Sequence, residues 1–304
     1  MQNSKTSGER AGNSGQIVAW VALLFVLTFL CALPLIIGGI SLPKLSPSAP
    51  LFPISFAGVM LVGYTPMLAA LLVAGFFPGA AGVRPLLRQV CTWRVGIGWY
   101  GIALIGPIVL FLLADVVHFV LGGTRPQPWL RFPSPSYFGP GGLVFLVGSL
   151  LAGSFGEEPG WRGFALPPLQ KRYGALAGSI LIGLIWSTWH IWIVITPGGF
   201  SLMTPVDVVL NTYVRLIATA VIYTWMYNST GGSLFLVMVA HAGHNIAGTL
   251  IQAPADGIRD VSAIVALSYL AVAIGVVLMT GPRTLSRSNR GDGAAFHEAN
   301  LSGC

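Results

Sequence analysis

The sequence predicts an all-α membrane protein with about eight transmembrane helices, and three observations support this fold class. Hydrophobic residues make up 54% of the 304 residues, and the mean hydropathy is +0.78. Only 8% of the residues are charged, whereas a soluble domain has about 25%. Apolar runs of about 20 residues, the length that a helix needs to cross a bilayer, recur along the chain between segments rich in proline and glycine.

Eight apolar runs define the predicted spans. They cover residues 17–40, 54–77, 96–121, 141–166, 176–196, 208–227, 233–252 and 262–280. We therefore expect a polar N-terminal tail at 1–16, a helix bundle at 17–280 and a disordered, polar C-terminal tail at 281–304. No small-residue cleavage site follows the first run, so we interpret it as a transmembrane helix and not as a removable signal peptide.

The basic residues predict the orientation of the bundle. If the N-terminus is cytoplasmic, four of the sixteen Lys and Arg residues fall on the opposite side, and Arg215 lies within the sixth span. Cytoplasmic loops of membrane proteins carry the excess of basic residues, so we expect both termini in the cytoplasm. The net charge of +7 then reflects topology, and the expected partner is the lipid bilayer rather than nucleic acid. The three cysteines form no recognisable motif.

The fourth span carries three charged residues, Glu157, Glu158 and Arg162. Only about fifteen apolar residues precede the glutamates, which would rise about 22 Å as a helix, less than the hydrocarbon layer of about 30 Å. The span must then continue to the predicted breakers Pro167 and Pro168. Both carboxylates therefore lie at membrane depth, where an ionisable residue is a functional-site hypothesis by default.

The residues around the two glutamates assign them different roles. Arg162 follows Glu158 at the i,i+4 spacing of a helical ion pair, so we expect these two to pair and Glu157 to be left for chemistry. A purely structural pair would not explain Glu157. Pro159 removes a helical hydrogen bond, and Gly160 follows it, so the helix should kink or open there. Non-helical backbone at membrane depth must be buried in protein or line a water-filled cavity. We expect such a cavity here, open toward the cytoplasm.

Two later spans contain histidines. The fifth contains Trp186-x-x-x-His190, and the seventh contains His241-Ala-Gly-His244-Asn245. His241 and Asn245 share one face of a helix. Counted from the cytoplasmic ends of their spans, four polar groups lie within about 10 Å of one another in depth. The four are Glu157, His190, His241 and Asn245. We expect them to converge in one polar pocket.

In this order, the motifs Glu157-Glu158-x-x-x-Arg162, Trp186-x-x-x-His190 and His241-x-x-x-Asn245 resemble those of the CAAX prenyl protease and bacteriocin-processing family of intramembrane proteases, also called the Abi family. The resemblance covers about residues 141–250, which we interpret as the protease core. One departure is Trp186, where the family often has phenylalanine. The resemblance implies an intramembrane endopeptidase that acts on a membrane-associated, prenylated or leader-containing peptide.

The resemblance also implies a role for each motif residue. Glu157 and His190 would activate a water molecule, while His241 and Asn245 would stabilise the oxyanion. The family is often described as metalloproteases, in which case Glu157, His190 and His241 correspond to zinc ligands; a metal-independent glutamate mechanism has been argued too. The residues leave both alternatives open, because this set suits a catalytic zinc ion and also a glutamate base facing oxyanion donors.

Other polar and aromatic residues of the spans receive structural interpretations. We expect an interhelical ion pair between Asp115 and Arg215. His118 and His244 are each expected to form an interhelical hydrogen bond. The tryptophans at i, i+3 and i+6 in the fifth span are expected to serve in packing or in an interfacial belt. They are Trp186, Trp189 and Trp192.

The rival interpretation is a non-enzymatic membrane protein on the same scaffold, either a proton-coupled transporter or an immunity or scaffolding protein. Transporters often contain internal repeats, and the sequence has no second copy of the glutamate or histidine motifs, which disfavours that reading. The presence of every polar group of the three motifs favours activity. We expect a multi-pass protein of the inner or plasma membrane. The sequence does not identify a substrate or an oligomeric state.

Overall fold

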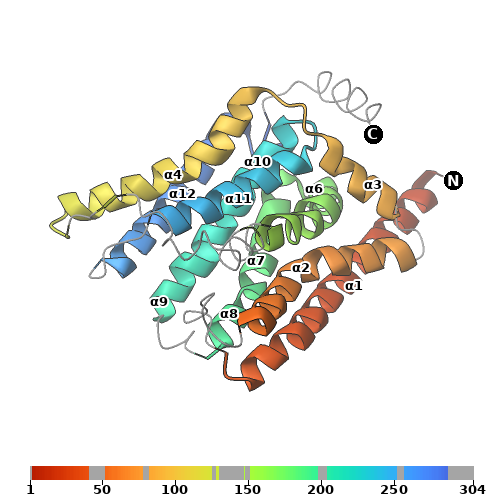
Figure 1. Cartoon of the computed structure of the whole chain (residues 1–304). Helices are drawn as coiled ribbons and strands as arrows, with labels where there is room; N and C mark the ends of the chain where they lie inside the picture. The colour runs from red at the N-terminus through yellow and green to blue at the C-terminus, as the bar shows by residue number, and fades with distance from the viewer. Residues whose placement is uncertain are drawn as a thin grey trace.

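The computed structural model describes residues 2–40, 52–77, 82–124, 128–129, 147, 151–197, 204–251 and 257–286. These residues form helices and connecting segments without any β-strand (Figure 1), which confirms the predicted all-α class. Six helices in the described part are long and apolar enough to cross a membrane. The protein is therefore a multi-pass integral membrane protein.

The helices follow one another in the order of the predicted spans. Those that precede the first motif are α1 (Gln2–Ile37), α2 (Phe52–Phe76), α3 (Val83–Arg88), η2 (Gln89–Cys91) and α4 (Ile97–Val120). The motif region contains η4 (Leu151–Phe155), η5 (Pro159–Ala165), α6 (Leu166–Tyr173), α7 (Ala175–Trp189) and α8 (Ile191–Ile195). The last are α9 (Pro205–Asp207), η7 (Val208–Val214), α10 (Arg215–Ser229), α11 (Leu234–Leu250) and α12 (Ile258–Thr280). Segments η4, η5 and η7 are π-helical.

Six predicted spans coincide with the six long apolar helices. The predicted span at 233–252 corresponds to α11, whose apolar part, Leu234–Gly248, is shorter. The span predicted at 141–166 begins outside the described residues. The count of eight spans and the cytoplasmic position of both termini therefore stay predictions.

The two ends of the described chain extend the bundle. Helix α1 begins at Gln2, so residues 2–16 continue the first span as helix. At the other end, the carbonyl groups of Pro282 and Arg283 accept hydrogen bonds from the N–H groups of Leu176 and Ala175. The ordered bundle thus includes residues 281–286, and residues 287–304 lie outside the described part.

Pro167 and Pro168 do not end the fourth span as predicted. They lie in the first turn of α6, which continues the helical chain to Tyr173. The prediction was wrong because the first N–H groups of a helix have no intrahelical partner. A proline in the first turn, which lacks this N–H group, therefore does not break the helix. The helical chain ends one residue later, at Gly174, which has a φ of 85°.

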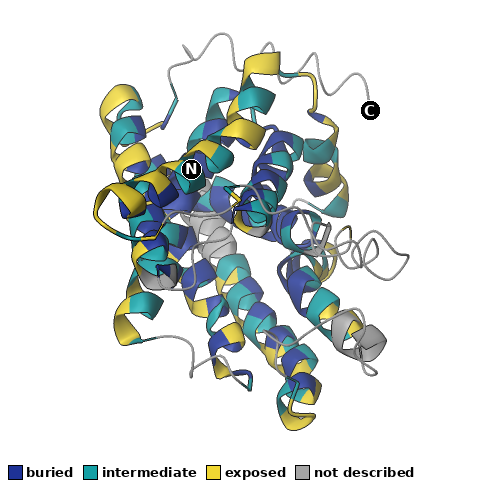
Figure 2. Ribbon diagram, turned by 60° about the vertical axis from the view of Figure 1, so that its left-hand side comes forward, coloured by how far each residue is buried: buried dark blue, intermediate teal, exposed yellow. Residues whose placement is uncertain are grey.

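The bundle is built from pairs of packed helices: α1 packs on α2, α4 on α11, and α7 on α10 (Figure 1). Buried residues face its centre, and exposed residues lie on its periphery (Figure 2). Many of the exposed residues are large and apolar, including Leu104, Ile105 and Val109 of α4. This pattern suits a bundle whose outer surface faces lipid and whose centre holds the polar groups.

Glycine permits the close contact between α7 and α10. A Cβ atom added at Gly183 would lie 2.7 Å from the Cα atom of Ile217. In contrast, a Cβ atom at Gly275 of α12 would meet nothing within 4 Å. Small residues at such crossings let the backbones of membrane helices approach each other.

We expect Gly183→Ala to destabilise the protein by about 1–3 kcal/mol, because the added methyl group overpacks a backbone contact. Gly275→Ala is the matched control and should be neutral or stabilising by about 0.5–1 kcal/mol, since alanine is the better helix former. The free energy of unfolding in mixed micelles measures both. Equal effects of the two substitutions would contradict the described packing of α7 on α10.

Candidate functional site

The backbone at the first motif leaves the regular α-helix. Gly156 and Glu157 form a turn between the π-helical segments η4 and η5. The carbonyl of Glu157 accepts hydrogen bonds from the N–H groups of Gly160 and Trp161, at 3.0 and 3.1 Å. The predicted opening of the helix beside Glu157 is thus confirmed. Its form is a π-helical motif, a feature that often occurs at functional sites.

The motif turn is fixed to α2. The N–H group of Met67 donates a hydrogen bond to the carbonyl of Gly156 at 3.1 Å. Pro66 precedes Met67 inside α2, and its carbonyl accepts a hydrogen bond from the indole of Trp20 at 3.2 Å. A Cβ atom at Gly160 would lie 2.4 Å from that carbonyl oxygen. Gly160 is therefore required for the motif to lie this close to α2.

Two indole groups orient the carboxylate of Glu157. Its Oε2 atom accepts a hydrogen bond from Nε1 of Trp186 at 2.6 Å and another from Nε1 of Trp161 at 3.3 Å. The glutamate is 5% exposed, and the two tryptophans are buried. No described hydrogen bond uses Oε1 of Glu157. The carboxylate is thus held through one oxygen, and the other is left to meet a water molecule or a substrate.

The carboxylate of Glu158 is the centre of a buried charge network. Nη1 of Arg162 lies 3.0 Å from both Oε1 and Oε2 of Glu158, so the predicted ion pair forms. Nδ1 of His241 also lies 2.8 Å from Oε1. Glu158 and Arg162 are both fully buried. The contact with His241, which comes from α11, was not expected from the sequence.

Two aromatic rings enclose the guanidinium of Arg162. Its Cζ atom lies 4.8 Å from the ring centre of Trp186 and 5.1 Å from that of Tyr223. Nε and Nη2 of Arg162 have no hydrogen-bond partner among the described residues. Cation–π interactions with the two rings partly compensate for those bonds. Trp186 and Tyr223 therefore hold the arginine in the orientation that Glu158 requires.

The imidazole of His190 is fixed in one tautomer. Its Nδ1 atom lies 2.9 Å from the carbonyl oxygen of Trp186. A carbonyl only accepts hydrogen bonds, so Nδ1 carries the proton and Nε2 of the neutral ring has the free lone pair. The ring packs against Trp189 and Trp186, with centroids 4.8 and 5.7 Å apart.

The third motif faces the π-helical segment η4. A Cβ atom at Gly153 would lie 2.6 Å from Nδ2 of Asn245 and 3.7 Å from Nε2 of His241. These two nitrogen atoms therefore face the same point of the backbone, where glycine leaves room. Because Glu158 occupies Nδ1 of His241, Nε2 is the ring atom available on this side.

The structure brings the three predicted motifs together around Trp186. Its ring centre lies 5.5 Å from that of His241 and 5.7 Å from that of His190, and its N–H group binds Glu157. Trp186 was expected to serve in packing or in an interfacial belt. The belt interpretation is wrong, because all three tryptophans of this segment are buried, with Trp192 the most exposed at 8%. Tyr223 had no sequence signal that distinguished it from other aromatic residues of α10.

The two histidines among the predicted zinc ligands each meet a partner through Nδ1. The described residues include no group of three or more His, Cys, Asp or Glu side chains placed to hold a metal ion. His241 directs Nδ1 at Glu158 and not at Glu157, and His190 directs Nδ1 at a backbone carbonyl. Nε2 of each histidine is thereby left available, and a metal-ligating histidine commonly uses its other ring nitrogen in this way, so zinc binding by Glu157, His190 and His241 stays a prediction.

Of the other intramembrane groups, only some have the partners that were expected. Among the ion pairs of the described residues, none joins Asp115 to Arg215. His118 instead lies 3.9 Å from Asp260. His244 makes an interhelical hydrogen bond, as expected, with Nδ1 2.6 Å from the hydroxyl of Tyr269.

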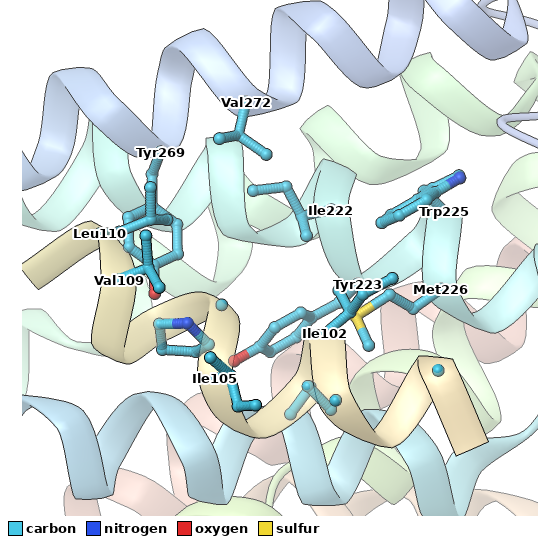
Figure 3. A pocket seen from close by; sticks show the side chains of 16 residues that line it. Ile102, Ile105, Val109, Leu110, Ile222, Tyr223, Trp225, Met226, Tyr269 and Val272 are labelled. Carbon is cyan, nitrogen blue, oxygen red and sulfur yellow. The ribbon is translucent and has the colours of Figure 1, made fainter.

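An apolar cavity of about 540 Å³ lies beside the site, between α4, α10 and α12 (Figure 3). Most of its lining residues are aliphatic or glycine. Tyr223 also lines the cavity, and its ring is the one that packs on Arg162. Tyr223 thus contacts both the apolar cavity and the charge network.

Comparisons with known proteins agree with this geometry. Residues 139–247 match the family model for type II CAAX prenyl endopeptidases, Rce1-like. The chain is also 30% identical over 156 residues to CAAX prenyl protease 2 of Methanococcus maripaludis, which covers 50% of this chain and 56% of that protein. The chain thus spans just over half the length of this relative. The matched segment contains all three motifs, and the resemblance drawn from them is confirmed: residues 139–247 are similar to the Rce1-like family of CAAX prenyl endopeptidases.

Proposed function

We propose that this protein is an intramembrane endopeptidase in which Glu157 and His190 activate a water molecule. The observation that carries the proposal is the separation of the two adjacent carboxylates into different environments. Glu158 is bound by Arg162 and His241, whereas Glu157 is held through one oxygen by indole N–H groups. Two carboxylates with different surroundings can perform different tasks, one structural and one catalytic.

In the proposed reaction, the water molecule loses a proton to Glu157 or to Nε2 of His190 as its oxygen attacks the peptide carbonyl carbon. The tetrahedral intermediate then breaks its carbon–nitrogen bond. The proton held by the glutamate or the histidine passes to the leaving amine. Glu157 lies in the turn before η5 and His190 directly follows α7, and Trp186 contacts both of them.

His241 and Asn245 are the proposed oxyanion donors. Nδ2 of Asn245 is an N–H donor, and Nε2 of His241 donates when the ring is protonated. Donors fixed in advance around a developing negative charge supply a large part of the rate enhancement in acyl transfer. Gly153 leaves space for the oxyanion in front of these two nitrogens.

The substrate is proposed to be a peptide carried by the membrane. The relative's name refers to prenylated CAAX peptides, and for this chain we propose a prenylated or otherwise membrane-associated peptide cleaved from the cytoplasmic side of the inner or plasma membrane. Zinc assistance stays a prediction, and no step proposed here uses a metal. The alternative, a binding protein or transporter on the same scaffold, predicts no dependence of peptide cleavage on Glu157.

We expect Glu157→Gln to reduce kcat for cleavage of a quenched fluorescent peptide by roughly 10²- to 10⁴-fold, which is the usual contribution of a general base. The protein is tested at full length in lipid nanodiscs, with a peptide that ends in a prenylated C-a-a-X sequence. The amide keeps the size of the side chain and can still meet the indole N–H groups through its oxygen. Undiminished cleavage by this variant would remove Glu157 from the mechanism.

Two controls accompany this measurement. Melting temperatures of the variant and the wild-type protein show whether the fold is kept. Metal content of the same preparations tests the zinc interpretation separately. Stoichiometric zinc that is lost in His190→Ala or His241→Ala would support the zinc-assisted version of the mechanism.

A second prediction concerns the indole N–H group of Trp186. Trp186→Phe keeps an aromatic ring over Arg162 but removes the hydrogen bond to Glu157, so kcat should fall roughly ten- to a hundredfold with little change in KM, as for the loss of a hydrogen bond to a charged group. Trp189→Phe is the matched control. Its indole lies on the same helix, is equally buried and donates to Thr28 at 2.7 Å. Equal losses in the two variants would contradict the proposed role of Trp186.

A further inference from the structure

The apolar cavity beside the site is a space that the proposed mechanism does not use. Its volume of about 540 Å³ lies in the range of sites that hold one small ligand. Helix α4 forms one side of the cavity and α12 the other, with Ile222 and Tyr223 of α10 between them (Figure 3). All three helices belong to candidate membrane spans. The cavity therefore lies at membrane depth.

The lining of the cavity offers a ligand very few polar groups. Among the described lining side chains none is charged, and only those of Tyr223, Trp225 and Tyr269 have an N–H or O–H group. The hydroxyl of Tyr269 already meets Nδ1 of His244 at 2.6 Å. A strongly polar ligand would lose its hydration here without compensation. The ligand that fits is therefore a hydrocarbon over most of its length.

The cavity is continuous with the outer, apolar surface of the bundle. Ile105 and Val109 of α4 line it, and they are 58% and 53% exposed. Val272 of α12 also lines it and is 38% exposed. In a membrane these exposed side chains face lipid. A hydrocarbon chain can thus enter the cavity sideways from the bilayer without passing through water.

The length of the cavity matches one leaflet of a bilayer. Its lining on α4 extends from Gly98, next to the first residue of the helix, to Leu110. At 1.5 Å per residue this segment is about 18 Å long. Half of the hydrocarbon layer is about 15 Å thick. The cavity therefore extends from one face of the membrane to near its midplane, as the acyl chains of one leaflet do.

The ring of Tyr223 links the cavity to the charge network. It lines the cavity, and its centre lies 5.1 Å from Cζ of Arg162. Its hydroxyl is buried and has no hydrogen-bond partner within the described part of the chain. The position of the ring is therefore determined by packing on its sides. A chain in the cavity supplies van der Waals contacts that an empty space lacks.

We propose that the cavity between α4, α10 and α12 binds one acyl chain of a bilayer phospholipid, and that this chain supports the ring of Tyr223 on Arg162. The hydrocarbon lining, the lateral opening and the leaflet length all fit a chain whose head group stays at the membrane surface. Phospholipid surrounds the protein at high concentration, so the site is filled by mass action. The effect on cleavage rests on the proposed function, whereas the binding of the lipid does not.

Native mass spectrometry tests the binding without an enzymatic assay. Full-length protein is delipidated in detergent and titrated with dipalmitoyl or dioctanoyl phosphatidylethanolamine. We expect one dipalmitoyl lipid to bind per protein, at least roughly tenfold more tightly than the dioctanoyl lipid, because each buried methylene adds favourable transfer free energy. Dipalmitoyl phosphatidylglycerol should bind about equally well, since no charged side chain contacts the chain. Binding that follows the head group and not the chain would overturn the proposal.

Gly106→Leu tests whether the bound lipid occupies this cavity. Gly106 lines it, and a Cβ atom added there meets nothing within 4 Å. The leucine should therefore be tolerated, and it should weaken binding of the dipalmitoyl lipid roughly tenfold or more by filling the space. Gly101→Leu, at a second lining residue with the same free space, should have the same effect and provides a second reading if Gly106→Leu does not fold.

Gly275→Leu is the matched control. A Cβ atom at Gly275 of α12 also meets nothing within 4 Å, and this glycine is not among the residues that line the cavity. The variant should bind the dipalmitoyl lipid as the wild-type protein does. Unchanged binding in both cavity variants would overturn the proposal, and so would equal losses in the cavity variants and the control.

A prenylated C-a-a-X peptide distinguishes a bilayer lipid from the substrate as the source of the chain. The peptide is added in excess to the lipid complex of the Glu157→Gln protein. Retention of the lipid supports the proposal. Displacement of one lipid by one peptide would assign the cavity to the substrate and would overturn it.

The activity of the wild-type protein tests the link through Tyr223. Addition of dipalmitoyl lipid to the delipidated protein should raise kcat roughly three- to tenfold, because a fixed ring holds Arg162 and its partners in position. Gly275→Leu should show the same rise, and Gly106→Leu should show none. An equal rise in Gly106→Leu would contradict the link. Because lipid binding is measured by mass, failure of the proposed protease activity would not be mistaken for failure of this lipid site.

Discussion

The ion pair between Glu158 and Arg162 is the interaction on which the rest of the site depends. Both side chains are fully buried, so loss of either would leave an uncompensated charge in a medium of low dielectric constant. The pair also determines the positions of its neighbours. Arg162 lies between two aromatic rings, and Glu158 binds the imidazole of His241 from another helix. Glu157, one residue away, is thereby left outside the pair with a different set of partners.

The backbone makes this arrangement possible. Glu158 and Arg162 lie four residues apart on the motif helix, so their side chains can pair. The turn at Gly156 and Glu157 directs the carboxylate of Glu157 toward α7. Gly160 lets the motif lie against the backbone of α2, and Gly153 leaves room for the side chains of Asn245 and His241 from α11. The same segment therefore supplies a rigid ion pair, a separate carboxylate and space for a substrate group.

The positions of the spans and the set of residues proposed for the site could be predicted from sequence, because both depend on local sequence patterns. Apolar length identifies a span, and buried polar residues at one depth have few places to lie except against one another. The partners of individual atoms could not be predicted in this way. Nothing in the spacing of the motifs shows that His241 contacts Glu158, or that the indole of Trp186 binds Glu157. The role of Pro167 was missed because proline signals the start of a helix as well as its end. The expected partner of Arg215 was wrong because depth alone does not determine which helices face each other.

The most direct test of this account is a double-mutant cycle on the buried pair, with Glu158→Gln and Arg162→Met alone and together. The free energy of unfolding is measured in mixed micelles for the four proteins. We expect each single substitution to destabilise the protein by about 3–5 kcal/mol and the double variant to recover much of this loss, with a coupling energy of about 2 kcal/mol or more. Effects that add to within about 0.5 kcal/mol would show that the two side chains do not depend on each other, and would contradict the central place given to the pair.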